Sequence, residues 1–462
     1  MSDTAAQLRR ELRGIFQQRR FLLIGGAVSE QLRLGRELCA LGAERPFLLG
    51  QGSGAGVLPA AGEADWHALD VSGADRLAEA RAYEAALRQP PFEVLVALDT
   101  WDPEYRALAV GPGVLGDLRS VAGRARYARR LPHWLRLEDK TRLHRFLSAL
   151  GIEGGPHAVV RARPADLSNA AMHLDEGSGT VWSGDTSEGP HGGATRVRWV
   201  RTAQQARAAG DFFARHCRAV RVMPFVEGVP CSIHGLVLPR GVAVFRPVEL
   251  VVLRRPDVFE YAGAATYWDP DPADRHAMRE LARCVGEGLR VRSAYRGAYT
   301  VDGVLGAHGF VPTEINTRIG AAFHLLAPEL PLAPLALAAA EGETLDCDPA
   351  ELEACVLEAA DAERGGGLTV AVTGAPAQPL RHALVETADG FRLAQDGELE
   401  AATVVVGSSH GAGWLSVRPN ARRTAIGPAF APRAVRALAL AESLCGVHVG
   451  PLEAARPVPR LT

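Results

Sequence analysis

The sequence predicts a multidomain protein of mixed α/β and α+β class. Its 462 residues are enough for about three domains of ordinary size. The N-terminal part alternates apolar strand patterns with helical patterns, which is typical of a parallel α/β domain. The middle part carries pairs of strand patterns joined by glycine-rich turns, and the last part carries short strands and one helix.

The elements of the N-terminal part follow from its hydrophobic periodicity. Short apolar runs predict strands, and apolar residues three and four positions apart predict helices. These patterns predict a leading helix over 1–20, strands over 20–26, 46–50 and 93–99, and helices over 30–41 and 75–87.

The middle part begins with a predicted helix over 137–150, which carries Lys140 in its first turn and ends at Gly151. A loop of small residues over 183–195 follows; such a loop can bend its amides over phosphate oxygens, although an exposed turn has the same composition. Strands are then expected over 196–200 and 241–254, and two strands over 220–238 are separated by a short connector at 227–230. Helices are expected over 203–216, 272–289 and 328–340, and a hairpin over 299–318.

From about residue 346 the composition shifts. Helices are predicted over 351–362 and 432–444, with short strands over 368–372, 401–406 and 415–417 between them. This pattern predicts a small α+β domain without an obvious chemical role.

The hairpin over 299–318 carries the strongest chemical signal. Side chains alternate along a strand, so Glu314 and Asn316 share one face, and Asp302 joins them if the two strands pair. Two carboxylates and an amide oxygen, with Arg318 just beyond, suit magnesium and phosphate. From spacing alone, a solvated strand face with scattered charges is an equal alternative.

Composition limits the classes of function. The formal net charge of −2 argues against a general nucleic-acid-binding surface. The chain starts with a polar, arginine-rich stretch rather than a signal sequence, and its longest apolar run, 330–340, is too short to span a bilayer. The seven cysteines are dispersed without a Cys-x-x-Cys pair. We therefore expect a cytoplasmic protein that binds neither nucleic acid nor membrane.

Lysine is almost absent from this chain. Of the 51 lysine and arginine residues, fifty are arginine, and the single lysine is Lys140. A position that keeps lysine in such a sequence indicates a site that needs a compact ammonium group rather than a planar guanidinium. Codon bias that leaves one lysine by chance is the alternative.

A second nucleotide-binding pattern is weaker. Residues 111–116 match the six-residue glycine fingerprint of dinucleotide-binding enzymes. Pro112 removes a backbone donor that the pyrophosphate would use, so we expect a turn here, and an NAD-dependent dehydrogenase is the less favoured alternative.

Taken together, residues 133–340 resemble the ATP-grasp superfamily, whose metal-binding signature is a hairpin with an acid twelve positions before a Glu-x-Asn sequence. The resemblance implies that Asp302, Glu314 and Asn316 hold two Mg²⁺ ions that bridge the phosphates of ATP. It implies catalytic roles for Arg318, which would stabilise the acyl phosphate and the tetrahedral intermediate, and for Lys140, which would bind phosphate.

The resemblance also implies where the nucleotide binds. The phosphate-covering loop corresponds to Gly192, Gly193, Ala194 and Thr195, and the hinge beside adenine corresponds to Met223, Phe225 and Val226.

The sequence departs from the family pattern at two positions. Most members carry a second lysine on the strand before the loop, where this chain has none, so Arg196 or another arginine is expected to replace it. The acid that binds the ribose hydroxyls would fall near Pro230, and Glu227 is the candidate to replace it.

The flanking regions, with the stretch Val-Pro-Cys-Ser-Ile-His-Gly over 229–235, are similar to peptide ligases of the pheganomycin type. This resemblance implies a pre-ATP-grasp α/β domain over 1–132, an ATP-grasp core over 133–345 with lobes over 133–222 and 223–345, and an α+β domain over 346–462.

The function implied is that of an ATP-dependent ligase that joins a small-molecule carboxylate to an amine, such as amino acids or peptides, in the biosynthesis of specialised metabolites. The reaction would pass through an acyl phosphate and release ADP and phosphate. An ATP-grasp kinase, a thioester-forming ligase and a nucleotide-binding protein without catalysis remain alternatives, and a homo-oligomer is possible. Candidates to line the substrate pocket are Arg246, Glu249, Arg254, Glu260, Tyr261 and Tyr267.

Overall fold

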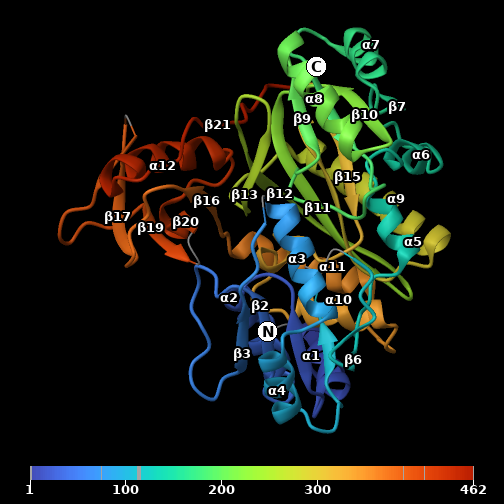
Figure 1. Ribbon diagram of the computed structural model, residues 1–462, viewed down its shortest axis with the longest axis vertical. Helices are drawn as coiled ribbons and strands as arrows, with labels where there is room; N and C mark the ends of the chain where they lie inside the picture. The colour runs from blue at the N-terminus through green and yellow to red at the C-terminus, as the bar shows by residue number, and fades with distance from the viewer. Residues whose placement is uncertain (1–2, 74, 112–115, 389, 410–411, 461–462) are drawn as a thin grey trace.

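The computed structural model describes residues 3–73, 75–111, 116–388, 390–409 and 412–460. Figure 1 shows a parallel sheet with its helices at the bottom of the molecule, a small antiparallel sheet with two helices at the top, and a large antiparallel sheet that runs between them and out to the left. The glycine fingerprint over 111–116 falls largely on 112–115, which lie outside the described residues.

The N-terminal part is a parallel α/β unit, as its sequence pattern predicts. In the described chain its strands lie in the order β3-β2-β1-β4, and every pairing is parallel. The strands are β1 (Phe21–Ile24), β2 (Phe47–Gln51), β3 (Asp65–Leu69) and β4 (Leu108–Val110), and the helices are α1 (Asp3–Phe16), α2 (Val28–Ala40), α3 (Arg76–Arg88) and α4 (Phe92–Trp101).

The strand predicted over 93–99 is wrong, because this segment is the helix α4. Its apolar residues form a nearly continuous run, but only Val94 and Leu98, four positions apart, are fully buried, as expected of one helical face. Pro91 stands directly before the helix, where its missing N–H is not needed.

The predicted single helix over 137–150 is also wrong. The structure has α5 (Pro132–Leu135) with the 3-10 turn η1 (Arg136–Glu138), then a turn, then α6 (Leu143–Ser148). Asp139 causes the break, because its carboxylate accepts hydrogen bonds from Thr141 N (2.9 Å) and Thr141 Oγ1 (2.6 Å). Lys140 therefore lies in the turn and not in the first turn of a helix.

The small antiparallel sheet at the top of Figure 1 has the order β7-β10-β8-β9 in the described chain, and α7 and α8 pack on it. The elements are β7 (Ala158–Arg161), α7 (Pro164–Leu174), β8 (Thr180–Gly184), β9 (Val197–Val200), α8 (Ala203–His216) and β10 (Ala219–Pro224). Trp182 and Phe213, both fully buried, anchor the core between helices and sheet.

The large antiparallel sheet has the order β15-β14-β11-β12-β13-β16-β20-β19-β17-β18 among the described residues. Its first part contains β11 (Gly228–Leu238), β12 (Gly241–Arg254), β13 (Phe259–Ala265), β14 (Gly297–Gly306) and β15 (Gly309–Asn316), with α9 (Pro272–Ser293), α10 (Leu332–Glu341) and α11 (Pro349–Ala362). The predicted hairpin is confirmed as β14 and β15.

The C-terminal strands continue this sheet, since β16 pairs with β13. They are β16 (Gly366–Val372), β17 (Leu380–Thr387), β18 (Gly390–Leu393), β19 (Ala402–Ser409) and β20 (Ala412–Pro419), followed by α12 (Ala431–Cys445) and β21 (Glu453–Ala454), which pairs with β12. The predicted class, a parallel α/β part followed by a two-lobed antiparallel core and a small α+β part, is confirmed.

In the part of the chain that the structure describes, we find no helix that combines the length and the apolar character needed to cross a bilayer.

Candidate active site

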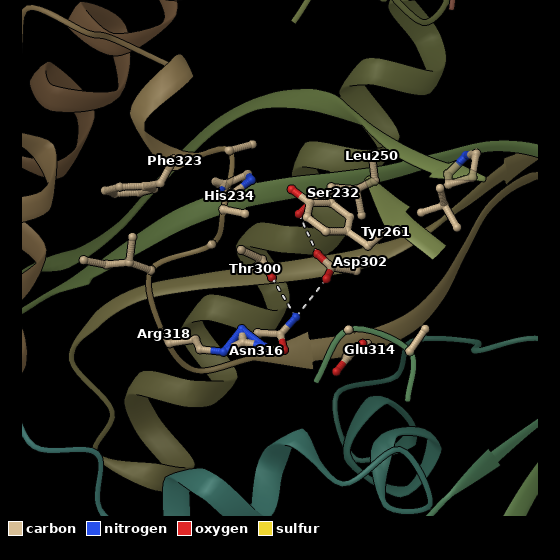
Figure 2. Close-up of a pocket in the computed structure, with 18 of the residues that line it drawn as sticks. Ser232, His234, Leu250, Tyr261, Thr300, Asp302, Glu314, Asn316, Arg318 and Phe323 are labelled. Atoms are coloured by element: carbon tan, nitrogen blue, oxygen red, sulfur yellow. Dashed lines mark hydrogen bonds between the residues drawn. The ribbon is translucent and has the colours of Figure 1, made fainter. Parts of the chain in front are cut away.

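The polar residues of the predicted site meet on one face of β11, β14 and β15. Asp302 pairs with Glu314 across the hairpin and with Ser232 on β11. The next row, two residues along each strand, contains Asn316 and Thr300 with His234 beside them. Figure 2 shows these side chains together.

A bulge in the hairpin shapes this face. The register of β14 and β15 shifts directly after Asp302, so that Gly303 pairs with Pro312 and Thr313 is the extra residue. Thr313 Oγ1 donates a hydrogen bond to the carbonyl oxygen of Asp302 (3.2 Å), which fixes the bulge beside the carboxylates.

Asp302 is held from two sides. Ser232 Oγ donates to Asp302 Oδ1 (2.6 Å), and Asn316 Nδ2 donates to Asp302 Oδ2 (2.8 Å) and to Thr300 Oγ1 (3.1 Å), as the dashed lines of Figure 2 mark. The amide nitrogen of Asn316 is thus engaged, and its oxygen is turned away from these partners.

The three predicted metal ligands fit a hard divalent cation. Asn316 Oδ1 is buried and has no hydrogen-bond partner in the described structure. Burial, and then the neighbouring carboxylate of Glu314, raise the pKa of Asp302, as expected for two facing carboxylates that a bound cation would neutralise. The described residues hold no cluster of three His, Cys, Asp or Glu side chains, so this set of two carboxylates and an amide is the oxygen-rich candidate for Mg²⁺.

Lys140 reaches the same site from the turn after η1. Its Nζ lies 2.6 Å from Glu314 Oε1, and its side chain is almost entirely buried. Asp139, which sequence reasoning missed, anchors this turn, because its second oxygen accepts a hydrogen bond from Thr186 Oγ1 (3.0 Å) in the loop after β8. The lysine is therefore fixed between the two antiparallel sheets.

Arg318 follows β15 and lines the same cavity. Burial opposes its charge, but the carboxylates of Glu138, Glu314 and Asp302 outweigh burial and raise the pKa of Arg318. Glu138 is itself an ion-pair partner of Arg130, and it accepts a hydrogen bond from Thr317 N (2.8 Å). This contact holds the chain next to Arg318 in place.

A cavity of about 720 Å³ contains these groups. Its walls come from the two antiparallel sheets, from the carboxyl end of β1 and one side of α2, and from the segment that leads into α10. The volume is in the range of small-molecule sites.

The predicted nucleotide-binding residues divide into two groups. Those that line the cavity are Lys140, Gly193, Ala194, Met223, Phe225 and Val226, and those that do not are Gly192, Thr195 and Glu227. Phe225 stacks on Trp199 with the ring centroids 4.3 Å apart, and its N–H donates to Gly179 O (2.9 Å). The hinge therefore offers an aromatic wall.

Glu227 has other partners. Arg254 Nη1 donates to Glu227 Oε2 (2.9 Å), and Arg456 N donates to Glu227 Oε1 (3.0 Å). The carboxylate thus ties the C-terminal segment to the start of β11.

Arg196 does not line the cavity. It forms an ion pair with Glu188 (2.5 Å) instead. The structure brings Arg221 of β10 into the cavity, opposite Ser183 of β8. Arg221 is 2% exposed, and its Nε and Nη1 have no hydrogen-bond partner in the described structure. Burial lowers the pKa of Arg221 to about 10. In the sequence Arg221 is one arginine among fifty. The only signal for it is its place between two apolar residues of β10, which puts it on the opposite face of the strand from them.

Of the six candidates for the substrate pocket, Arg254 and Tyr261 line the cavity. The expectation is wrong for the others, which serve packing: Arg246 pairs with Asp269 and Asp361, Glu260 pairs with Arg255, Tyr267 packs on Phe430, and Glu249 accepts hydrogen bonds from the backbone N–H groups of Phe430 and Ala431 at the start of α12.

Comparison with known proteins identifies the fold. No family model and no curated protein matches the sequence. Among solved structures, biotin carboxylase from Campylobacter jejuni, in complex with an ATP analogue, aligns with a TM-score of 0.56 at 13% identity over 96% of this chain and 94% of its own. Phosphoribosylamine–glycine ligase from Thermotoga maritima gives 0.50 at 16% identity, over 94% and 98% of the chains. Carboxyaminoimidazole ribonucleotide synthase from Aspergillus clavatus, complexed with ATP, gives 0.50 at 13% identity, over 94% and 100%.

Proposed function

Since this chain has the ATP-grasp fold, we propose that it is an ATP-dependent ligase that joins a small-molecule carboxylate to an amine through an acyl phosphate. The observation that carries the proposal is the convergence of two sets of side chains in one cavity. One set is Asp302, Glu314 and Asn316, and the other is the cationic group of Lys140, Arg221 and Arg318. Phosphoryl transfer needs this combination of hard oxygen ligands and positive charge, and it needs no side-chain nucleophile.

The site's own cations bind the triphosphate. Lys140 and Arg221 enter the cavity from the turn after η1 and from β10, and Arg318 enters from the end of the hairpin. Asp302, Glu314 and Asn316 would hold Mg²⁺, which when bound neutralises charge on the phosphate oxygens. The base would lie against Phe225 at the hinge, and the turn with Gly193 and Ala194 would cover the phosphates and exclude water.

The reaction has two steps. A carboxylate oxygen attacks the γ-phosphorus, the bond to the β-phosphate oxygen breaks, and ADP leaves. The amine nitrogen then attacks the acyl carbon, loses a proton, and expels inorganic phosphate as the amide forms. Arg318, which lines the same cavity, would stabilise the negative oxygen that develops in the second step.

The substrates we propose are amino acids or short peptides, and the product a peptide-like metabolite. The finer resemblance to pheganomycin-type peptide ligases stays a prediction, since the compared structures share only the fold.

The test is ADP release, measured against a panel of amino acids and peptides, with mass detection of the product. Asp302→Asn and Glu314→Gln should each abolish amine-dependent ADP release while the protein stays folded, and Asp211→Asn, on the exposed side of α8, is the matched control. Near-normal turnover by either site variant would refute the assignment. ATP binding without ADP release for any acceptor would instead indicate a protein that only binds nucleotide.

A further inference from the structure

Two histidines line the cavity, His234 and His324, and neither has a role in this scheme; only His234 is buried. His234 is 1% exposed and lines the cavity, and neither Nδ1 nor Nε2 has a hydrogen-bond partner among the described residues. A neutral imidazole has one donor and one acceptor, and buried polar groups of proteins are nearly always paired. A ligand in the cavity would supply the partner that the protein does not.

The position of His234 on β11 indicates which part of a bound ligand would contact it. Strand β11 starts beside the hinge at Gly228, passes Ser232 in the row of Asp302, and reaches His234 in the row of Thr300. A nucleotide with its base at the hinge and its terminal phosphate at Asp302 therefore ends before His234. A group bound beside His234 would then belong to one of the two substrates, the carboxylate or the amine, and not to the nucleotide.

The surroundings of His234 favour an uncharged contact. Burial lowers the pKa of His234 to about 3, so the ring is neutral near neutral pH. Phe323 packs beside it with the ring centroids 6.0 Å apart (Figure 2), and the chain at Gly320 comes so close that a Cβ there would lie 2.5 Å from His234 Cε1. The ring is thus fixed in orientation. Arg318 is the partner for a carboxylate, whereas an unpaired imidazole nitrogen suits an N–H donor.

We propose that His234 binds the amine substrate, with one ring nitrogen accepting a hydrogen bond from the attacking nitrogen. This contact holds the amine with its lone pair toward the acyl carbon. It gives His234 a role that the two-step scheme above does not assign. The inference rests on the proposed ligase function.

The cavity beyond His234 defines suitable probes. Its walls there carry mostly apolar side chains, with Arg33 and Glu37 on the α2 side and His324 next to Phe323. The apolar ones include Leu34, Phe323, Ala327, Leu330 and Leu332. Leucinamide and phenylalaninamide are therefore chosen as amines, since their blocked carboxylates leave only the amine to react. N-acetyl amino acids serve as carboxylates that cannot act as amines.

The experiment separates activation from amine binding. The acyl phosphate is trapped with a high concentration of hydroxylamine and measured as hydroxamate, and amide formation is measured with leucinamide or phenylalaninamide. His234→Leu should raise the KM for leucinamide or phenylalaninamide, or lower kcat/KM for these amines, about tenfold or more, as expected for a lost hydrogen bond. Hydroxamate formation and the KM for ATP should stay within about twofold of wild type.

Two further variants control for structure. His234→Gln keeps a hydrogen-bond acceptor and should recover part of the amine affinity. This variant keeps the inference testable if the Leu variant folds poorly. His382→Leu removes a half-buried histidine of β17, whose Nε2 also lacks a partner but which does not line the cavity, and it should leave both reactions unchanged.

Several results would overturn the inference while leaving the proposed function intact. They are an unchanged amine KM in His234→Leu, equal losses of hydroxamate and amide, a Gln variant no better than the Leu variant, and a wild type that forms hydroxamate but no amide with any amino acid amide. A wild type that forms neither product with any pair refutes the ligase function itself, and the inference with it.

Discussion

Replacing Arg221 with methionine should make the ligand-free protein more stable while weakening ATP binding. Most core substitutions destabilise a protein. Arg221 is the exception that the structure predicts, because its guanidinium is buried at 2% exposure and two of its nitrogens lack partners. Methionine fills most of the same volume without a charge to desolvate.

The magnitudes follow from the geometry. Burial lowers the pKa of Arg221 from 12.5 to about 10, a difference that corresponds to roughly 3 kcal/mol of unfavourable free energy in the ligand-free protein. The free energy of unfolding of Arg221→Met should therefore rise, by up to about that amount. A lost contact between guanidinium and phosphate costs about 1.5–3 kcal/mol, so the Kd for ATP should rise about 10- to 150-fold.

Urea unfolding and calorimetric titration with ATP measure the two effects. Arg196→Met is the matched control: Arg196 is also 2% exposed, but it pairs with Glu188 and does not line the cavity. That variant should be less stable and should bind ATP as wild type does. A destabilised Arg221→Met protein with wild-type ATP affinity would refute the assignment of Arg221 as a phosphate-binding cation.

Two more predictions concern the turn that carries Lys140. Burial opposes the charge of Glu138, but Arg130 and the N–H of Thr317 outweigh burial and lower the pKa of Glu138 from 4.5 to about 2. The ionised carboxylate should therefore add roughly 3 kcal/mol to the free energy of unfolding above pH 4.5, and this contribution should be lost as the pH falls toward 2. A free energy of unfolding that falls with pH to the same extent in Glu138→Gln would contradict this. Lys140→Arg should keep its Tm within a few degrees, because arginine can also pair with Glu314. It should lower kcat about tenfold or more, because a planar guanidinium cannot place its charge where the compact ammonium of Lys140 lies. Steady-state ADP release tests this, and wild-type kcat would contradict it.

The hairpin was predictable because its signals are local. Alternation along each strand and the glycine turn between them predict the two strands and their pairing without knowledge of the rest of the fold. Regular pairing from the turn would place Asp302 opposite Thr313, so the bulge at Thr313, which brings Glu314 opposite Asp302, is a feature that only the structure reveals. The segment 93–99 was not predictable in the same way, because a short apolar run fits both a buried strand and a helix. The break at Lys140 depends on how the Asp139 side chain bonds its own backbone.

Arg221 and His234 show where sequence reasoning ends. Each faces the cavity because of strand pairings between distant segments, Arg221 with Ser183 and His234 with Thr300. Neither register follows from local pattern, and a buried arginine or histidine without a partner is recognised only when its surroundings are known.

Transfer of ¹⁸O from the carboxylate substrate to phosphate tests whether the reaction passes through an acyl phosphate. An N-acetyl amino acid labelled in both carboxylate oxygens is incubated with the protein, ATP, Mg²⁺ and leucinamide, and the released phosphate is analysed by mass spectrometry. If the acyl phosphate forms, each inorganic phosphate carries one ¹⁸O atom and each amide carries one. Amide formed with unlabelled phosphate, or labelled carboxylate recovered intact beside hydrolysed ATP, would contradict an acyl-phosphate intermediate.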